Sequence, residues 1–124
     1  MKLTIHIFYF LFSFLFAGIE PSDEIVTALK QGKSAELVKY FDEKVSIKII
    51  NQEDVLSKPQ AEANIKFFFE KHTVKTFSSS HVSSVNNGAQ YITGTLETSN
   101  GKFRVSILLR RNLIAQFRIE NDND

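Results

Sequence analysis

Histidine is the side chain in this sequence best suited to acid–base chemistry, because imidazole titrates near neutral pH and the chain has no cysteine. Of the three histidines, His81 is the most informative, since it stands in a serine-rich segment. In a β-strand, Ser79, His81 and Ser83 point to the same face. A histidine placed this way could contact a ligand or act as an acid or base, or it could be a structural residue held by the neighbouring hydroxyls.

The hairpin that follows decides which way this face points. If Asn87-Gly88 forms a two-residue loop, His81 lies opposite Gly94 on the concave face, and the glycine leaves open space beside the imidazole. A three-residue loop instead pairs Val82 with Ile92 and turns His81 to solvent, and the sequence leaves both registers open. In the first register, the candidate ligand-binding residues are Ser79, His81, Ser83 and Gly94.

The other two histidines have simpler interpretations. His72 ends a predicted helix, where the negative end of the helix dipole favours a cation, so we interpret it as a capping residue. His6 lies in an apolar N-terminal run and belongs to that segment. The sequence has no His-x-His, His-Glu-x-x-His or glycine-rich phosphate motif, so we expect neither a metal site nor a cofactor.

Catalysis by His81 would require a carboxylate or a second base beside the reacting atom. In the register that the Asn100-Gly101 turn predicts for the last three strands, no Asp or Glu points inward. Four other acids fall near the ends of predicted elements, where solvated loops are expected: Asp42, Glu43, Glu53 and Asp54. We therefore assign no catalytic residue, and a small hydrolase or isomerase with a pocket histidine is the alternative to a non-catalytic domain.

The N-terminus has the pattern of a secretory signal peptide. An apolar run at residues 5–16 follows Lys2, and small residues end it. The run is shorter than the ~20 residues that span a bilayer, so an uncleaved membrane anchor is the less favoured alternative. We expect cleavage near Ala17 or Gly18 and export of the mature protein to the periplasm or the medium.

The composition is that of an ordinary globular domain. The chain has 124 residues, 23% of them charged, and its formal net charge is +1. Removing the signal peptide, residues 1–18, leaves one domain, residues 19–124, with no apolar run long enough for a stable membrane span. A net charge this small does not attract nucleic acid. Without cysteine there is no disulfide, so the core alone must hold the domain together.

The first half of the domain has the spacing of helices. Residues 23–31 form an amphipathic segment that Ser22 can cap and Gly32 can end. A second helix is predicted at residues 35–41, and residues 45–50 alternate as a strand does.

The third predicted helix has the clearest start signal. Ser57-Lys58-Pro59-Gln60 has the spacing of a capping box, and the helix is expected to reach Lys71. Its core face is expected to consist of Ala61, Ile65, Phe68 and Phe69.

The second half has the pattern of an antiparallel meander. The four predicted strands are residues 76–85, 89–98, 102–110 and 114–120. Asn100-Gly101 predicts a two-residue turn, and pairing outward from it places Leu96 opposite Val105 and Glu97 opposite Arg104.

The last hairpin tests this register. A three-residue loop at 111–113 pairs Ile107 with Phe117 and places Glu120 opposite Arg104, whereas a two-residue loop turns Phe117 to the polar face. We therefore predict the three-residue loop. The residues that lead the predicted core face are Ile92, Leu96, Val105, Ile107 and Phe117.

Short motifs along the chain resemble those of a domain-of-unknown-function family of small exported Bacteroidetes proteins. They are Ile25-Val26-Thr27-Ala28-Leu29-Lys30-Gln31-Gly32, Tyr40-Phe41, Ser57-Lys58-Pro59-Gln60-Ala61-Glu62, Gly94-Thr95-Leu96, Ser99-Asn100-Gly101 and Phe103-Arg104-Val105. The resemblance implies a cone-shaped α+β fold, with helices packed on a curved antiparallel sheet, like nuclear transport factor 2 and the cystatins. It implies no activity, because that fold hosts enzymes, carriers and interaction modules.

The predicted function is therefore non-catalytic binding by an uncharacterised exported domain. The ligand is a small apolar molecule held between helix and sheet, or a protein partner held on the sheet. A partner surface would use Tyr91, Leu108 and Ile114 as exposed apolar residues.

Overall fold

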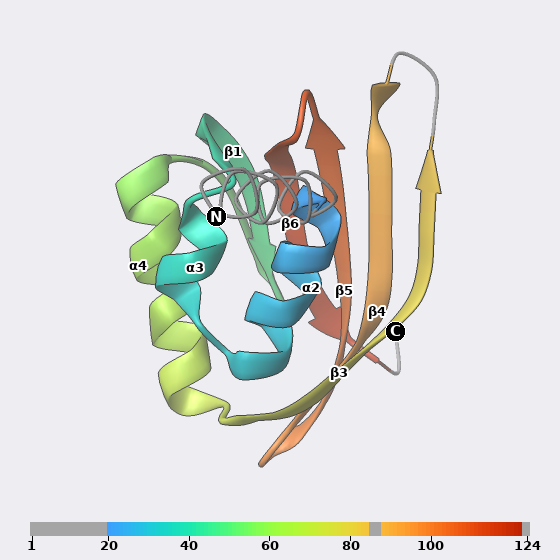
Figure 1. Cartoon of the computed structure of the whole chain (residues 1–124). Helices are drawn as coiled ribbons and strands as arrows, with labels where there is room; N and C mark the ends of the chain where they lie inside the picture. Colours follow the sequence, from blue (N-terminus) through green and yellow to red (C-terminus); the bar gives the residue numbers. More distant parts are fainter. Residues whose placement is uncertain (1–19, 85–87, 123–124) are drawn as a thin grey trace, which may run out of the picture.

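The computed structural model describes residues 20–84 and 88–122, and the predicted signal peptide, residues 1–18, lies outside the described residues. The elements are α2 (Pro21–Gln31), α3 (Ser34–Val38), β1 (Phe41–Ile49), β2 (Gln52–Ser57), α4 (Lys58–Lys71), β3 (Val74–Ser84), β4 (Gln90–Thr98), β5 (Gly101–Arg110) and β6 (Leu113–Asn121). The helices lie on one side of a curved sheet (Figure 1). The α+β class predicted from the sequence is confirmed.

The six strands form one sheet in the order β2-β1-β6-β5-β4-β3. Neighbouring strands are antiparallel except β1 and β6, which pair in parallel, so the sheet is mixed rather than wholly antiparallel. This parallel pair joins an N-terminal hairpin, β1–β2, to the C-terminal meander. The edge strands of the sheet are β2 and β3.

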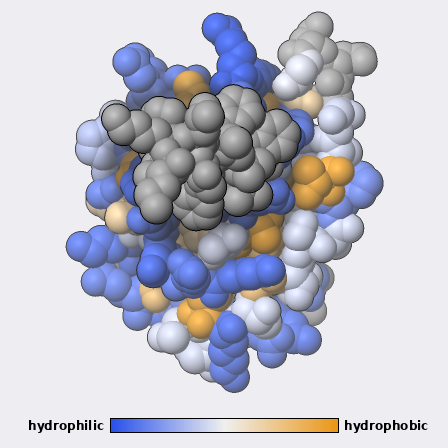
Figure 2. All heavy atoms as spheres, in the orientation of Figure 1, coloured by the Kyte–Doolittle hydropathy of each residue, from blue (hydrophilic) through white to orange (hydrophobic). Residues whose placement is uncertain are grey.

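The core lies between the helices and the predicted apolar face of the meander. The five residues chosen from the sequence are all 0% exposed: Ile92, Leu96, Val105, Ile107 and Phe117. The predicted core face of α4 is buried as well, at Ala61, Ile65, Phe68 and Phe69. In the described part of the face seen in Figure 2, hydrophilic residues predominate and apolar residues are scattered.

The first two helices differ from the prediction at their ends. α2 begins one residue before Ser22, which is buried in its first turn instead of capping it, and Glu20 is the N-cap. Gly32 ends α2 in the left-handed conformation (φ 64°), as predicted. The second helix stops at Val38, because Phe41 is drawn into the core as the first residue of β1, where its ring meets that of Phe117.

Helix α4 starts as the sequence predicts. The Ser57 hydroxyl accepts a hydrogen bond from the Gln60 backbone N–H (3.4 Å), and the Gln60 side chain accepts one from the Ser57 N–H (3.2 Å). Because Pro59 has no N–H, the helix start has three unpaired donors, and this reciprocal pair satisfies two of them. It fixes the point at which the chain leaves β2.

The β4–β5 turn lies one residue earlier than predicted. Ser99 and Asn100 form the turn, Thr98 pairs with Gly101, and Leu96 pairs with Phe103 instead of Val105. Glu97 consequently faces Lys102 rather than Arg104. The error shifts the pairing by two residues, so every side chain stays on its predicted face.

The β5–β6 hairpin combines features of both predicted loops. Arg111 and Asn112 form a two-residue turn with positive φ values of 52° and 66°. A β-bulge after Leu108 then shifts the pairing by one residue. The shift restores the predicted pairs Ile107–Phe117 and Arg104–Glu120, so the loop length was wrong and the strand register was right.

Candidate functional site

The predicted His81 site does not have the inward geometry on which it was based. Val82 pairs with Ile92, which is the second of the two registers, and the side chain of His81 is exposed. Ser79 is also exposed and Ser83 is half-exposed. A β-bulge between Ser79 and His81 shifts the pairing by one residue, so residues beyond it no longer follow the face set by Phe77.

The space expected beside Gly94 is filled. A Cβ on this glycine would lie 2.5 Å from Cζ of Phe77 and 2.5 Å from the carbonyl oxygen of Ser78. The Phe77 ring therefore covers the glycine and is itself buried. The interpretation of Gly94 as the open side of a pocket is wrong, because a diagonal aromatic neighbour occupies the position of its missing side chain.

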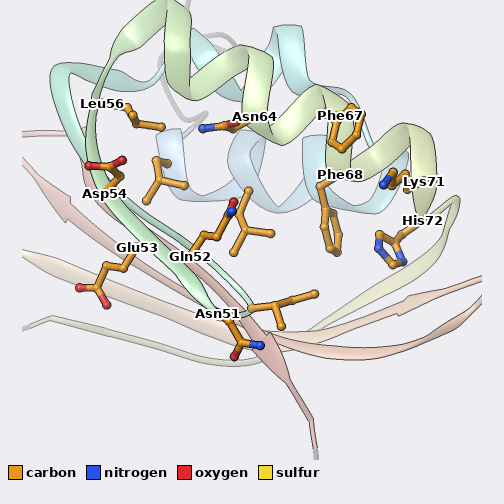
Figure 3. A pocket seen from close by; sticks show the side chains of 13 residues that line it. Asn51, Gln52, Glu53, Asp54, Leu56, Asn64, Phe67, Phe68, Lys71 and His72 are labelled. Carbon is orange, nitrogen blue, oxygen red and sulfur yellow. The ribbon is translucent and has the colours of Figure 1, made fainter.

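A groove of about 610 Å³ lies elsewhere, between α4 and the β1–β2 hairpin (Figure 3). Its apolar lining consists of Ile47, Ile49, Ile50, Leu56, Phe67 and Phe68. Its polar lining consists of Asn51, Gln52, Glu53, Asp54, Asn64, Lys71 and His72.

The hairpin wall of the groove was missed by the sequence analysis. Residues 52–54 are Gln, Glu and Asp, which strands disfavour, so this segment was interpreted as a loop. In the structure Ile50 adopts a positive φ of 58°, the chain reverses, and β2 pairs with β1 from Gln52 opposite Ile49. Pairing with β1 thus overrides the weak strand propensity of β2.

The floor of the groove is apolar and fixed. Ile47 and Phe68 are almost fully buried and belong to the main core, whereas Ile49, Ile50 and Leu56 are half-buried against it. A site with such a floor keeps its shape without a ligand.

One apolar ring at the groove is left largely in water. Phe67 is 59% exposed, although it directly precedes the buried Phe68 and Phe69 on α4. The ammonium of Lys71 lies 4.6 Å from the centre of its ring, one turn further along the helix.

His72 lines the groove at the end of α4. Its backbone N–H donates to the Phe68 carbonyl (2.9 Å), so it is the C-cap residue, in agreement with its predicted position at the helix end. Its ring stacks on Phe68 at a centroid distance of 4.3 Å and meets Phe103 edge-on at 5.0 Å. These two contacts fix the plane of the imidazole.

Asn100 fixes which nitrogen of that imidazole carries the proton. Its Oδ1 lies 2.6 Å from Nδ1 of His72, while its Nδ2 donates to the Lys71 carbonyl (3.3 Å). Because Oδ1 can only accept, Nδ1 is the donor and Nε2 is the acceptor of the neutral ring. Among the described residues Nε2 has no hydrogen-bond partner. The sequence analysis treated Asn100 as a turn residue alone, and nothing local to it indicates the link to α4.

The charges of the groove are separated along its length. In the view of Figure 3, Lys71 and His72 lie at one end and Asp54 at the other. Asp54 pairs with the buried Ile47, so its side chain lies on the side of the hairpin that faces α4. Within residues 20–84 and 88–122, no group of three His, Asp or Glu side chains could hold a metal ion.

A second hollow, of about 480 Å³, lies along α2 and α3. Its lining is mainly charged and polar, and Lys39 and Glu36 in it already form an ion pair (3.0 Å). Without an apolar floor it is the weaker candidate for a binding site.

The predicted partner surface on the sheet is not an exposed apolar patch. Ile114 is fully buried, Leu108 is nearly so, and only Tyr91 is half-exposed. Ile114 was assigned to the outer face because the bulge after Leu108 was not foreseen.

Helices on one face of a curved sheet, with a groove between helix and sheet, define a cystatin-like or nuclear transport factor 2-like domain. The chain is similar to an uncharacterised cystatin-fold protein from Novosphingobium aromaticivorans, with 10% identity and a TM-score of 0.58 over 82% of this chain and 98% of that one. At this identity the likeness concerns the fold alone.

The chain belongs to the family described as "Domain of unknown function (DUF4783)", which it matches over residues 22–121. It is similar to a DUF4783 protein from Bacteroides uniformis (33% identity, TM-score 0.77, covering 82% of this chain and 97% of that one). A DUF4783 protein from Bacteroides ovatus is similar too (34% identity, TM-score 0.75, covering 82% and 94%). These matches confirm the resemblance drawn from the motifs.

A comparison with curated proteins found no match. In the described part of the chain, every helix is too short or too polar to cross a membrane.

Proposed function

We propose that the groove between α4 and the β1–β2 hairpin binds a small, mainly apolar molecule without changing it chemically. The observation that carries this proposal is the hollow itself, about 610 Å³ with a fixed apolar floor. Pockets for small molecules have volumes of roughly 300–1,000 Å³ and similar linings. Phe67 supports the proposal, because an exposed phenylalanine at a groove gains contact area when a ligand covers it.

The chemistry around His72 favours binding over catalysis. General acid–base catalysis uses a histidine whose second nitrogen is oriented by a group that stabilises the imidazolium, commonly a carboxylate. Here Nδ1 donates to the neutral side-chain amide of Asn100, which is tied in turn to the Lys71 carbonyl. This arrangement offers a ligand one fixed acceptor, Nε2.

We also propose that the protein binds this molecule outside the cytoplasm, after export and removal of residues 1–18. Support comes from the apolar run at residues 5–16 and the small residues that follow it.

Titration with N-phenyl-1-naphthylamine, a neutral apolar fluorescent probe, tests the groove. We expect saturable binding with a Kd on the order of micromolar, and Phe67→Ala is expected to weaken it about five- to tenfold through lost apolar contact. Val55→Ala is the matched control, because Val55 is 66% exposed but does not line the groove. Neither variant should change stability by more than about 0.5 kcal/mol. Equal weakening by both variants, or no saturable binding, would contradict the proposal.

A further inference from the structure

In the described part of the chain, two charged groups at opposite ends of the groove have no ion-pair partner. Among the described residues, the Asp54 carboxylate forms no ion pair or hydrogen bond, and the Lys71 ammonium only covers the Phe67 ring. Lys48 and Lys39, by contrast, are each bonded to a glutamate at 3.0 Å. The groove therefore presents one negative and one positive end with an apolar floor between them (Figure 3).

The positive end offers a donor beside an acceptor. Lys71 can only donate hydrogen bonds, whereas Nε2 of the neutral His72 accepts one. The last residue of a peptide presents the complementary pair, a carboxylate next to an amide N–H. An alkyl carboxylate has no such donor and would leave Nε2 unpaired.

The length of the groove can be judged from α4. Asn64 and Lys71, which both line it, are separated by seven residues, or about 10 Å along the helix axis. In Figure 3 Asn64 lies between Asp54 and Lys71. The two charged ends are therefore at least about 10 Å apart. An extended chain of three residues reaches about 10 Å and is the shortest peptide that approaches both ends, whereas a single amino acid spans much less.

We infer that the ligand is a short apolar peptide with free ends, whose carboxylate meets Lys71 and whose ammonium meets Asp54. Its apolar side chains pack on the floor formed by Ile47, Ile49 and Phe68. This inference rests on the proposed function. It explains why the groove carries both charges, since an anion alone is repelled by Asp54 and a cation alone by Lys71.

Four forms of one tripeptide, Leu-Ala-Leu, test the inference by calorimetric titration at low salt and pH 7. The forms have both ends free, the amine acetylated, the carboxylate amidated, or both ends blocked. We expect the free peptide to bind most tightly and each block to weaken it about three- to tenfold, the range of a partly solvated ion pair. Added salt should reduce these differences.

Two variants test which residue contacts each end of the peptide. Lys71→Met should remove the preference for a free carboxylate and keep the preference for a free amine, and Asp54→Asn should do the reverse. Lys66→Met and Glu70→Gln are matched controls, because both residues are exposed on α4 and do not line the groove. The controls should leave the ranking of the four peptides unchanged.

The outcomes separate the inference from the proposed function. If all four forms bind equally, if only one end matters, or if no form binds while the naphthylamine probe does, the peptide inference is overturned and the groove proposal stands. If neither the peptides nor the probe bind, both are overturned.

Discussion

Gly94→Ala is the sharpest single test of how β3 and β4 pack. The added Cβ would meet the Phe77 ring and the Ser78 carbonyl oxygen, both at 2.5 Å, a separation that a real Cβ does not tolerate. The ring can tilt, but the carbonyl belongs to a strand paired with β4. Relief therefore requires the two strands to move apart.

The cost can be estimated from packing data. Overpacking a core costs about 1–3 kcal/mol, and the backbone contact argues for the upper end. Replacing a strand glycine returns roughly 0.5–1 kcal/mol, because alanine has less freedom in the unfolded chain. We expect a net loss of about 2 kcal/mol in the free energy of unfolding, which lowers the urea midpoint by about 1 M.

Urea unfolding of residues 20–124, followed by circular dichroism, measures this loss. Ser79→Ala is the control, because Ser79 lies opposite Gly94 and is exposed, so its change should stay within about 0.5 kcal/mol. Adding Phe77→Leu to Gly94→Ala should cost less than the sum of the two single changes, since the smaller side chain removes one of the two contacts. An unchanged midpoint in Gly94→Ala would refute this packing and restore the open space that the sequence analysis expected beside Gly94.

Two further predictions concern the carboxylate of Glu120 and the predicted signal peptide. Hydrogen bonding to Lys48 holds the pKa of the Glu120 carboxyl below its ordinary value, against the opposing effect of desolvation. The ionised carboxylate therefore stabilises the fold above the pKa of the unfolded chain, and this contribution is lost as the pH falls through the folded pKa. Urea unfolding should show Glu120→Gln to be less stable than the wild type at pH 7, by about 1 kcal/mol or less, and the difference should shrink as the pH is lowered through the acidic range. A difference that does not change with pH would contradict the assignment. When the protein is expressed from Met1 in a bacterial host, its intact mass should show that residues 1–17 or 1–18 have been removed. Phe12→Lys places a charge in the apolar run and should prevent export. An unprocessed wild-type protein would contradict the predicted signal peptide.

The sequence predicted the faces of the meander better than its pairing. A period of two in the apolar residues specifies which side chains point inward, so Ile92 and Val105 were placed correctly although their strands pair two residues away from the predicted register. Turn chemistry was the weaker guide. The side chain of Thr98 donates to the Gly101 carbonyl (2.8 Å), a local hydrogen bond that accompanies the Thr98–Gly101 pair and that the Asn-Gly signal does not indicate.

The groove could not be predicted from the sequence for a different physical reason. Its walls come from β1, β2 and α4, and the residue that orients His72 lies 28 positions later, in the β4–β5 turn. Local patterns correctly placed His72 at a helix end, yet a helix-end histidine is ordinarily solvated. Only the folded chain brings Phe103 against its ring and Asn100 against its Nδ1, and those contacts turn a capping residue into a fixed acceptor at a groove.

The same long-range contacts explain why the binding hypothesis moved from His81 to His72. Both histidines were interpreted from their neighbours in the chain. His81 lies on β3, an edge strand whose bulge turns it outward, and it is exposed among the residues that the structure describes. His72 lies where the end of α4, strand β5 and the β4–β5 turn meet. Contacts from all three elements restrict the conformation of its side chain. A histidine with its plane and tautomer fixed, beside an apolar hollow, is the feature of this chain that a ligand can recognise.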